Sequence, residues 1–397
     1  MPTLSNESTL LRDELLTDPG LANGVTFMGV QFPGIDRTDY LALHPQARQV
    51  GWFMSPSLRK GMAEGRAELL SHDYLAIVRH LAEMPPVDLA CAHLTPPDAD
   101  GWCNAGLACD FLPLVWKQAR RRIAHLNPRL PRLPGSFRVH VSELSAALEA
   151  DGPLNDFVEP PAGEIERRIA THVASLVRDG DTLQFGIGAL PLAAAQALTG
   201  HRRLRFRSGM ATAAVRTLWE AHALDRDAPI ITGVILGDAS LRTFAAELGT
   251  LWMTDVSETH NVQAIAATPR FIAVNGAVQV DLFGQVNAER AGGVIQAGAG
   301  GLPAFAIGAS ASPGGRLVVC LPATARGGSI SRIVPALDDK AICTLPRWLT
   351  DVVITEHGIA QLRGLSLHAR AEALIAIAAP EHRHTLAQTW HSIGKAA

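Results

Sequence analysis

The sequence predicts an α/β protein made of two open, parallel-sheet domains, and three observations support this prediction. The chain has 397 residues, which is enough for two or three domains with substantial cores. Short apolar runs alternate with amphipathic segments along most of its length, as in parallel sheets covered by helices. A segment rich in Pro, Gly and acidic residues, Glu149 to Glu164, interrupts this alternation. We therefore expect one domain over residues 1–158 and another over residues 159–397.

The first predicted domain begins with a helical segment, "TLLRDELL", and continues as apolar runs around one further helix. The segment 112–125, "LPLVWKQARRRIAH", is predicted to be a helix whose Arg-rich part, 117–125, forms a solvated face. The alternative for that part is a contact to an anion or phosphate. Buried strands are expected at residues 24–32, 49–54, 87–94 and 137–142.

The second predicted domain opens with an amphipathic helix over residues 164–179. Its apolar positions Ile165, Ile169, Val173 and Leu176 recur at helical spacing. A helical tail is predicted over residues 367–390. Strands are expected between these helices at residues 182–187, 204–208, 231–236, 271–282, 316–321, 341–345 and 351–355.

The composition argues against several function classes. Charged residues make up 18% of the chain and the net charge is −3, so no strong field would attract nucleic acid or an anionic membrane. No apolar run reaches membrane-spanning length, and the acidic N-terminus does not resemble a signal peptide. The five cysteines form no CxxC pair and the histidines are scattered, so we expect no metal site and a reducing, cytoplasmic location.

Three glycine-rich loops are the strongest signs of a binding site. Gly186 and Gly188 lie in "FGIGALP", a strand-to-helix turn that could direct backbone N–H groups at an anion or serve only as a tight turn. Gly298, Gly300 and Gly301 form a second cluster, suited to an anion nest or an oxyanion hole. A third loop, suited to a phosphate or a pantetheine amide, contains Arg326, Gly327, Gly328, Ser329 and Ser331. A further ordered loop, 95–106, follows a predicted strand and is either a ligand loop or a structured turn.

The ordered motifs resemble those of the acetyl-CoA hydrolase/transferase family, which includes 4-hydroxybutyrate and acetate CoA-transferases. "VDLACAHLTPPDADGWCNAG", "LQFGIGALP", "VNGAVQVDLFGQVNAE" and "ATARGGSISRIVP" each match a family motif, and the similarity extends from about Asp88 to Pro380. The resemblance implies two related α/β domains of the CoA-transferase type. It also implies a glutamate on the strand that contains Gln279 here, which attacks an acyl-CoA and then holds CoA as a glutamyl thioester.

This chain departs from the family pattern at its reactive side chains. Gln279 replaces the glutamate, and an amide is a very poor nucleophile. In the family's HSEM-like motif, Arg207 replaces the histidine and Gly209 the acid. In the GxGGQxDF-like loop, Leu302 and Ala304 replace the polar residues. The family's first glycine-rich βα turn, expected before about residue 20, has no counterpart.

Three functions remain open at this point. The first is an acyl-CoA enzyme without a glutamyl intermediate, in which Gln279 orients the acyl group or a water and Glu289 or Asp281 acts as base. The second is a non-catalytic CoA-binding subunit paired with a homologous chain. The third is a CoA-transferase with a relocated carboxylate, for which Glu289 is the nearest candidate. In each case CoA or its thioester would be the small-molecule ligand, with no permanently bound cofactor, and we expect a homo-oligomer.

Overall fold

The computed structural model describes residues 1–32 and 34–394, and it groups them into two compact units. The first unit comprises Met1–Val158, Gly209–Thr212 and Pro229–His260. The second comprises Glu159–Ser208, Ala213–Ala228 and Asn261 onward. The chain therefore returns to the first unit twice after residue 158. The division into domains 1–158 and 159–397 stays a prediction.

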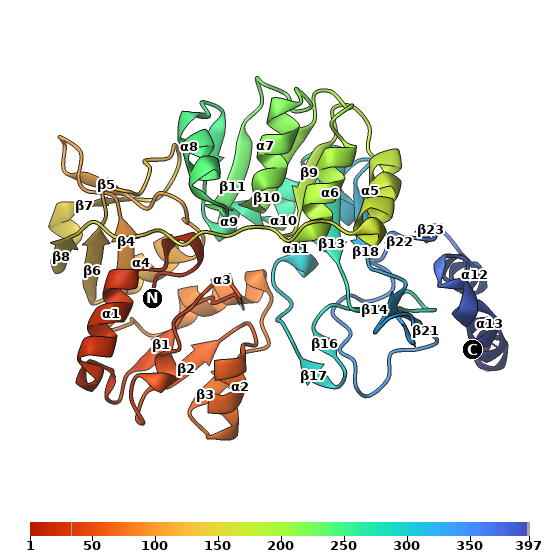
Figure 1. Cartoon of the computed structure of the whole chain (residues 1–397), viewed down its shortest axis with the longest axis horizontal. Coiled ribbons are helices and arrows are strands. Elements are labelled where there is room, and N and C mark those ends of the chain that lie inside the picture. The colour runs from red at the N-terminus through yellow and green to blue at the C-terminus, as the bar shows by residue number, and fades with distance from the viewer. Residues whose placement is uncertain (33, 395–397) are drawn as a thin grey trace. The chain divides into compact units, whose positions relative to one another are not determined.

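The first unit contains small sheets rather than the single one suggested by the sequence. Strands β1, β2 and β3 form a parallel sheet, β4, β6 and β8 form another, and β11 pairs in parallel with β12. Strands β5 and β7 form an antiparallel pair. The elements, shown from red onward in Figure 1, are α1 (Thr9–Thr17), β1 (Thr26–Met28), β2 (Arg48–Gly51), α2 (Pro56–Ala63), β3 (Ala67–Leu69), α3 (Tyr74–Glu83), β4 (Leu89–Leu94), β5 (Trp102–Asn104), α4 (Leu112–Gln118), β6 (Arg121–Leu126), β7 (Arg138–His140), β8 (Ala146–Glu149), β11 (Ile230–Ile235), α8 (Ala239–Glu247), β12 (Leu251–Met253) and α9 (Val256–Thr259).

The second unit is built on one mainly parallel sheet in which β10, β9, β13, β18, β22 and β23 are neighbours in that order. Only β23 runs antiparallel to its neighbour. Helix α5 packs against α6, and α11 packs against β13 and β18. The elements are α5 (Glu164–Leu176), β9 (Thr182–Phe185), α6 (Ala189–Ala197), β10 (Arg205–Ala211, ending in the first unit), α7 (Ala213–Glu220), α10 (Val262–Ala266), β13 (Phe271–Gly276), β14 (Gln279–Asp281), β15 (Val286–Asn287), β16 (Arg290–Ala291), β17 (Val294–Ile295), α11 (Leu302–Ala311), β18 (Arg316–Cys320), β19 (Thr324–Ala325), β20 (Ile330–Ser331), β21 (Ile333–Val334), β22 (Val352–Thr355), β23 (Gly358–Gln361), α12 (Leu367–Ile377) and α13 (Pro380–Gly394).

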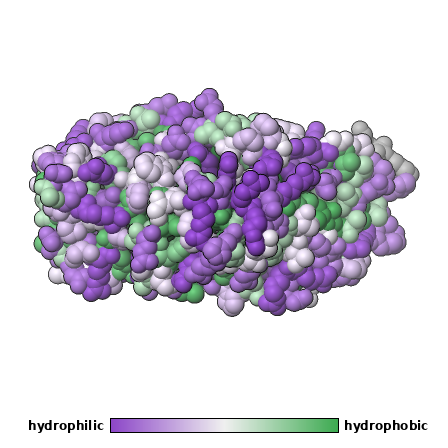
Figure 2. All heavy atoms as spheres, turned by 90° about the horizontal axis from the view of Figure 1, so that it is seen from above, coloured by the Kyte–Doolittle hydropathy of each residue, from purple (hydrophilic) through white to green (hydrophobic). Residues whose placement is uncertain are grey.

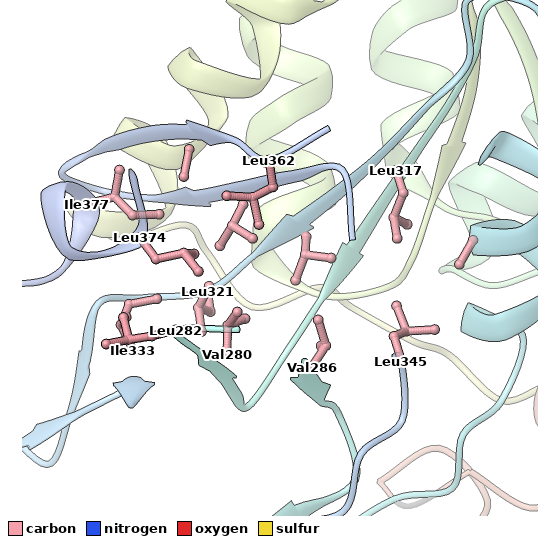
Figure 3. Packing of buried hydrophobic residues seen from close by; sticks show 14 of the residues in the cluster. Val280, Leu282, Val286, Leu317, Leu321, Ile333, Leu345, Leu362, Leu374 and Ile377 are labelled. Atoms are coloured by element: carbon pink, nitrogen blue, oxygen red, sulfur yellow. The ribbon is translucent and has the colours of Figure 1, made fainter. Parts of the chain in front are cut away.

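Side-chain caps begin many of the helices. The Ser8 hydroxyl accepts the Leu11 N–H at the start of α1, and the Asp73 carboxylate accepts the Ala76 N–H at the start of α3. In the sheet of the second unit, every residue of β9 and β22 is buried, which fits strands covered on both faces. The core around this sheet includes Leu317 from β18 and Leu374 from α12 (Figure 3).

The helix predicted over residues 112–125 is only half correct. Helix α4 ends at Gln118, and the Arg-rich part that was expected to be its solvated face is the central strand β6 of the β4-β6-β8 sheet. Both edges of β6 are paired, and His125 at its end is buried. Pairing on two sides thus overrides the local helical pattern, a common outcome for short segments.

Three other element predictions also need correction. Residues 341–345 form no strand; Leu345 makes only an isolated bridge to Val286. The run 271–282 is two strands, β13 in the main sheet and β14 in a separate small sheet. The tail divides into α12 and α13 immediately before Pro380, because proline cannot donate a helical hydrogen bond.

The surface is mixed in character. On the face shown in Figure 2, hydrophobic residues are interspersed among hydrophilic ones. Within the described part of the chain, no helix is both long and apolar enough to cross a membrane.

Candidate functional site

The predicted ligand loops of the second unit leave the same edge of its sheet. The parallel strands are in register at their carboxyl ends: Phe185 pairs with Val274, Gly276 with Cys320, and Cys320 with Ile354. Ligands of open α/β sheets bind at this edge. The predicted catalytic and CoA-binding residues all belong to this unit, and most lie in segments that follow these strands, whereas the candidate loop 95–106 lies in the first unit.

The Gly186–Gly188 turn joins β9 to helix α6. Gly188 is the residue before the helix and has φ of 111°, a conformation that favours glycine. A Cβ atom added at Gly186 or Gly188 would meet no atom within 4 Å, so the space beside the turn is open. Because the first N–H groups of a helix lack internal partners, this turn can present donors to an anion or to a thioester oxygen.

Gln279 lies on β14, between β15 and β21 in a small sheet. Its neighbour Val280 packs into the core (Figure 3), so the alternation of a strand turns Gln279 toward the opposite side. Asn287, its cross-strand partner on β15, donates from Nδ2 to Gln279 Oε1 at 3.2 Å. Within the described residues the Nε2 group of Gln279 has no partner. The side chain can therefore donate a hydrogen bond but cannot act as a nucleophile.

Asn287 fixes the direction of the Gln279 amide. Its side chain is fully buried, and its Oδ1 accepts the N–H groups of Glu289 at 3.1 Å and Arg290 at 2.9 Å. Its Nδ2 also donates to the Arg290 carbonyl at 2.7 Å. These bonds determine which end of the Asn287 amide faces Gln279, so that Oε1 of Gln279 accepts the hydrogen bond and Nε2 is left without a partner in the described residues.

Asp281, which the sequence predicts as a candidate base, accepts hydrogen bonds from residues of two loops. The carboxylate is completely buried and accepts four hydrogen bonds. The donors are the backbone N–H groups of Phe283, Gln285 and Leu337, and the Gln285 side chain. These contacts favour a structural role.

Glu289 is the less constrained of the two predicted carboxylates. It is half-buried, and its Oε1 accepts a hydrogen bond from the Thr344 hydroxyl at 2.8 Å. Its backbone carbonyl accepts the Gln296 N–H at 2.8 Å, which closes the β16–β17 hairpin. The glycine cluster Gly298, Gly300 and Gly301 follows directly after this hairpin in the chain. Gly301 caps helix α11, and Leu302 and Ala304 within α11 are buried in the core.

The third loop is the tip of the β19–β20 hairpin. Arg326, Gly327 and Gly328 all have positive φ, at 49°, 66° and 97°. Successive residues with such backbones can form anion-binding concavities. The exposed Arg326 guanidinium has no partner in residues 1–32 and 34–394, whereas His382 contacts the Gly328 carbonyl at 3.0 Å.

Two titratable side chains at the same edge were not predicted. Glu356 and His357 form the turn that follows β22, and the Glu356 carboxylate is buried. Its Oε2 accepts the Ala323 N–H at 2.8 Å. The sequence signal for this pair is the position of Glu356 and His357 directly after the apolar strand 351–355.

Position 209 belongs to the first unit and also lacks an acid. A Cβ atom added at Gly209 would stand 2.7 Å from Cε1 of the buried His260, so this imidazole occupies the space of a side chain there. Arg207, also on β10, is half-buried. Neither Gln279 nor Gly209 can therefore supply the carboxylate that the resemblance implies.

The first unit has a cavity of about 510 Å³, lined mainly by apolar residues including Phe27, Trp52 and Phe111. None of the predicted site residues lines it. Among the described residues, no three His, Cys, Asp or Glu side chains are arranged to hold a metal ion.

Parallel strands with glycine loops at their carboxyl ends are typical of open α/β proteins, and the similarity to solved structures shows that this one is of the CoA-transferase type. RipA from Yersinia pestis superposes with a TM-score of 0.90 at 25% identity, covering 99% of this chain and 93% of RipA. A 4-hydroxybutyrate CoA-transferase from Porphyromonas gingivalis superposes with a TM-score of 0.76 at 27% identity, covering 95% of each chain. The predicted fold class is confirmed.

The chain belongs to the acetyl-CoA hydrolase/transferase family. The model of the family's N-terminal domain matches residues 25–159 and that of its C-terminal domain matches residues 237–390. The 4-hydroxybutyrate coenzyme A transferase of Clostridium kluyveri is 33% identical over 341 residues, which cover 84% of this chain and 80% of the relative. The succinyl-CoA:cyclohexane-1-carboxylate CoA transferase of Geobacter metallireducens is 29% identical, covering 87% and 80%. The predicted family is therefore confirmed.

Proposed function

We propose that this protein cleaves an acyl-CoA thioester by passing the acyl group to water or to another external nucleophile, without a glutamyl-CoA intermediate. The observation that carries the proposal is the absence of an acid at both Gln279 and Gly209, while the glycine loops are kept. Relatives named for 4-hydroxybutyrate, succinyl and butyryl CoA transfer support the ligand class.

The chemistry of the candidate site supports direct attack. A mixed anhydride requires a carboxylate nucleophile, which the Gln279 amide cannot replace. The free Nε2 group of Gln279 is instead a hydrogen-bond donor, and so are the N–H groups at Gly186 and Gly188. Donors aimed at a thioester oxygen stabilise the negative charge that develops when a nucleophile attacks the carbonyl.

CoA itself would be held by the other two glycine loops. We place it near Gly298–Gly301 and Ala325–Ser329, where the exposed Arg326 guanidinium could pair with a phosphate. Calorimetry with CoA and several acyl-CoAs should detect this binding. No binding even at millimolar ligand would overturn the assignment of these loops.

Thiol release tests the activity directly. Purified full-length protein is incubated with acetyl-, butyryl-, succinyl- or 4-hydroxybutyryl-CoA, with and without free acetate as an acceptor. We expect release of free CoA, or formation of a new thioester, without a covalent protein–CoA species in the intact mass. Binding of CoA with no cleavage by the protein alone would instead support the non-catalytic subunit, particularly if a homologous chain co-purifies. Double-displacement kinetics and a CoA adduct on Glu289 or Asp281 would support the relocated carboxylate.

A further inference from the structure

The turn between β22 and β23 carries a carboxylate–imidazole pair at the edge of the sheet where the parallel strands of the second unit have their carboxyl ends. Thr355 pairs with Gly358, which leaves Glu356 and His357 as the two residues of the turn. The Glu356 side chain is 8% exposed and the His357 side chain 23%. The carboxylate is thus withdrawn from solvent, while the imidazole remains accessible.

The carboxylate is held so that one of its oxygens faces the imidazole. Glu356 Oε2 accepts the Ala323 N–H at 2.8 Å, and Oε1 lies 3.7 Å from His357 Nε2. This separation is within ion-pair range and longer than a hydrogen bond, as is common for catalytic pairs without ligand. A hydrogen on Nε2 directed at Glu356 leaves the Nδ1 lone pair of His357 open. In the described part of the chain, Nδ1 has no partner.

Backbone hydrogen bonds connect this turn to the strand of Gln279. Ala323, which donates to Glu356, accepts the Arg332 N–H at 2.9 Å. Arg332 in turn accepts the Val280 N–H at 2.9 Å, next to Gln279. Three consecutive links therefore join the carboxylate to the small sheet on which the Gln279 donor stands, all within the second unit.

We propose that His357 is the general base of thioester cleavage and that Glu356 is its positioning residue. The inference rests on the proposed function. His357 Nδ1 accepts a proton from water as the water oxygen bonds to the thioester carbonyl carbon. When the tetrahedral intermediate collapses, the C–S bond breaks and the imidazolium returns that proton to the CoA sulfur. The products are the free acid and CoA thiol, so no further reactant is needed.

The other carboxylates of the site fit this task less well. Asp281 already accepts four hydrogen bonds, so its lone pairs are engaged. Glu289 retains an oxygen without a partner in the described chain, but no imidazole or second acid is paired with it. Among these groups, only Glu356 forms a pair in which one member is fixed and the other accessible.

The test compares three variants with two matched controls. His357→Gln, His357→Ala and Glu356→Gln are assayed for acyl-CoA hydrolysis by the full-length protein. The controls are His384→Gln, an exposed histidine on α13, and Glu372→Gln, an exposed glutamate on α12. Thermal melting and CoA calorimetry establish that each variant is folded and binds ligand. Gln at position 356 keeps an oxygen for the Ala323 N–H, so a purely structural role predicts normal activity for that variant.

We expect kcat to fall on the order of 10²–10⁴-fold for His357→Gln, with KM and CoA affinity unchanged. Added imidazole should restore part of the activity of His357→Ala, because the site is partly open. Glu356→Gln should lower kcat about tenfold or more without raising KM, and the controls should match wild type. Wild-type hydrolysis that persists in folded His357 and Glu356 variants overturns this inference alone. A wild-type protein that cleaves no acyl-CoA overturns the proposed function together with it.

Discussion

At residue 279 a single atom separates two chemistries. Glutamine and glutamate have nearly the same shape, yet only the carboxylate can attack a thioester. Asn287 presents Nδ2 to this side chain, so a carboxylate oxygen would find the same donor that Gln279 Oε1 has now.

We predict that Gln279→Glu gains a slow ability to form a covalent CoA adduct. The half-buried position opposes the gain, because burial favours the protonated form of a carboxyl group. The departures from the family motifs at Gly209, Leu302 and Ala304 also oppose it, because residues that would orient the carboxylate are then missing, and misplacement of a reactive group by about 1 Å can cost about a hundredfold in rate. Intact-mass and peptide mass spectrometry after incubation with acetyl-CoA measure the adduct. Wild-type protein serves as the control and should remain unmodified at residue 279. A wild-type adduct on Glu289 or Asp281 would contradict the proposed mechanism.

A second residue-scale prediction concerns the buried His93. Burial, together with the stacked His125 ring 4.4 Å away, lowers the pKa of His93 to about 3. The folded form therefore binds no proton at His93 in the range where an unfolded histidine, with a pKa near 6.5, does. Above about pH 6.5, His93 does not lower the free energy of unfolding. As the pH falls from 6.5 toward 3, the unfolded state binds a proton that the folded state does not, and the free energy of unfolding decreases by about 1.4 kcal/mol per pH unit.

Histidine NMR can check this prediction. With ¹⁵N-labelled histidine, the His93 resonances should not titrate between pH 8 and pH 5. The hydrogen should reside on Nδ1, which faces the Asn6 carbonyl at 3.2 Å, while Nε2 faces the Asn127 amide at 3.0 Å. A titration midpoint near pH 6.5 would show that the site is more open than the structure indicates.

At the scale of elements, the sequence predicted helices and strands correctly where one hydrophobic pattern was clear. It failed where pairing with neighbouring strands determined the secondary structure. The helix predicted from residue 164 is α5. The apolar run at 231–236 overlaps β11, and the runs at 316–321 and 351–355 contain β18 and β22. The Arg-rich run became β6 because two neighbouring strands pair with it, which no local pattern reveals. Pro380 signals the break between α12 and α13, whereas the sequence prediction treated residues 367–390 as one helical tail.

The turn into α6 offers a matched pair of glycine substitutions. Gly188→Ala should destabilise the protein by about 1–3 kcal/mol, because alanine is strained at the φ of 111° found there. Gly186→Ala, two residues earlier and without a positive φ, should change stability far less. Both added methyl groups would enter open space, so a difference between the variants reports backbone strain alone. Chemical denaturation measures it, and equal stabilities would contradict the assigned conformation of Gly188.

At the scale of the whole molecule, the fold class and the family followed from the order of motifs along the chain. The glycine loops were found because glycine and proline mark turns whatever their surroundings. Glu356 and His357 were not, because their importance depends on which strand ends share an edge, and that order is a property of the sheet. For the same reason, sequence alone could not show that the Asp281 carboxylate accepts four hydrogen bonds.

We also predict a homo-oligomer, most simply a dimer. Trp348, with 75% of its surface exposed, is a large apolar side chain of the kind that subunit interfaces cover. Light scattering at micromolar concentration should give twice the chain mass of 42.3 kDa. Trp348→Ser tests whether this residue contributes to the contact, and a monomeric wild-type mass would contradict the prediction.

The backbone links from Val280 through Arg332 and Ala323 to Glu356 bear on how this branch of the family could diverge. Val280, Arg332 and Ala323 take part in these hydrogen bonds only through main-chain atoms, and the side chain of Gln279 takes part in none of them. A change from glutamate to glutamine at position 279 would therefore remove the nucleophile and leave these hydrogen bonds between the strands and loops in place. A different reactive group at the same edge of the sheet could then take over the reaction while these backbone hydrogen bonds stay as they are.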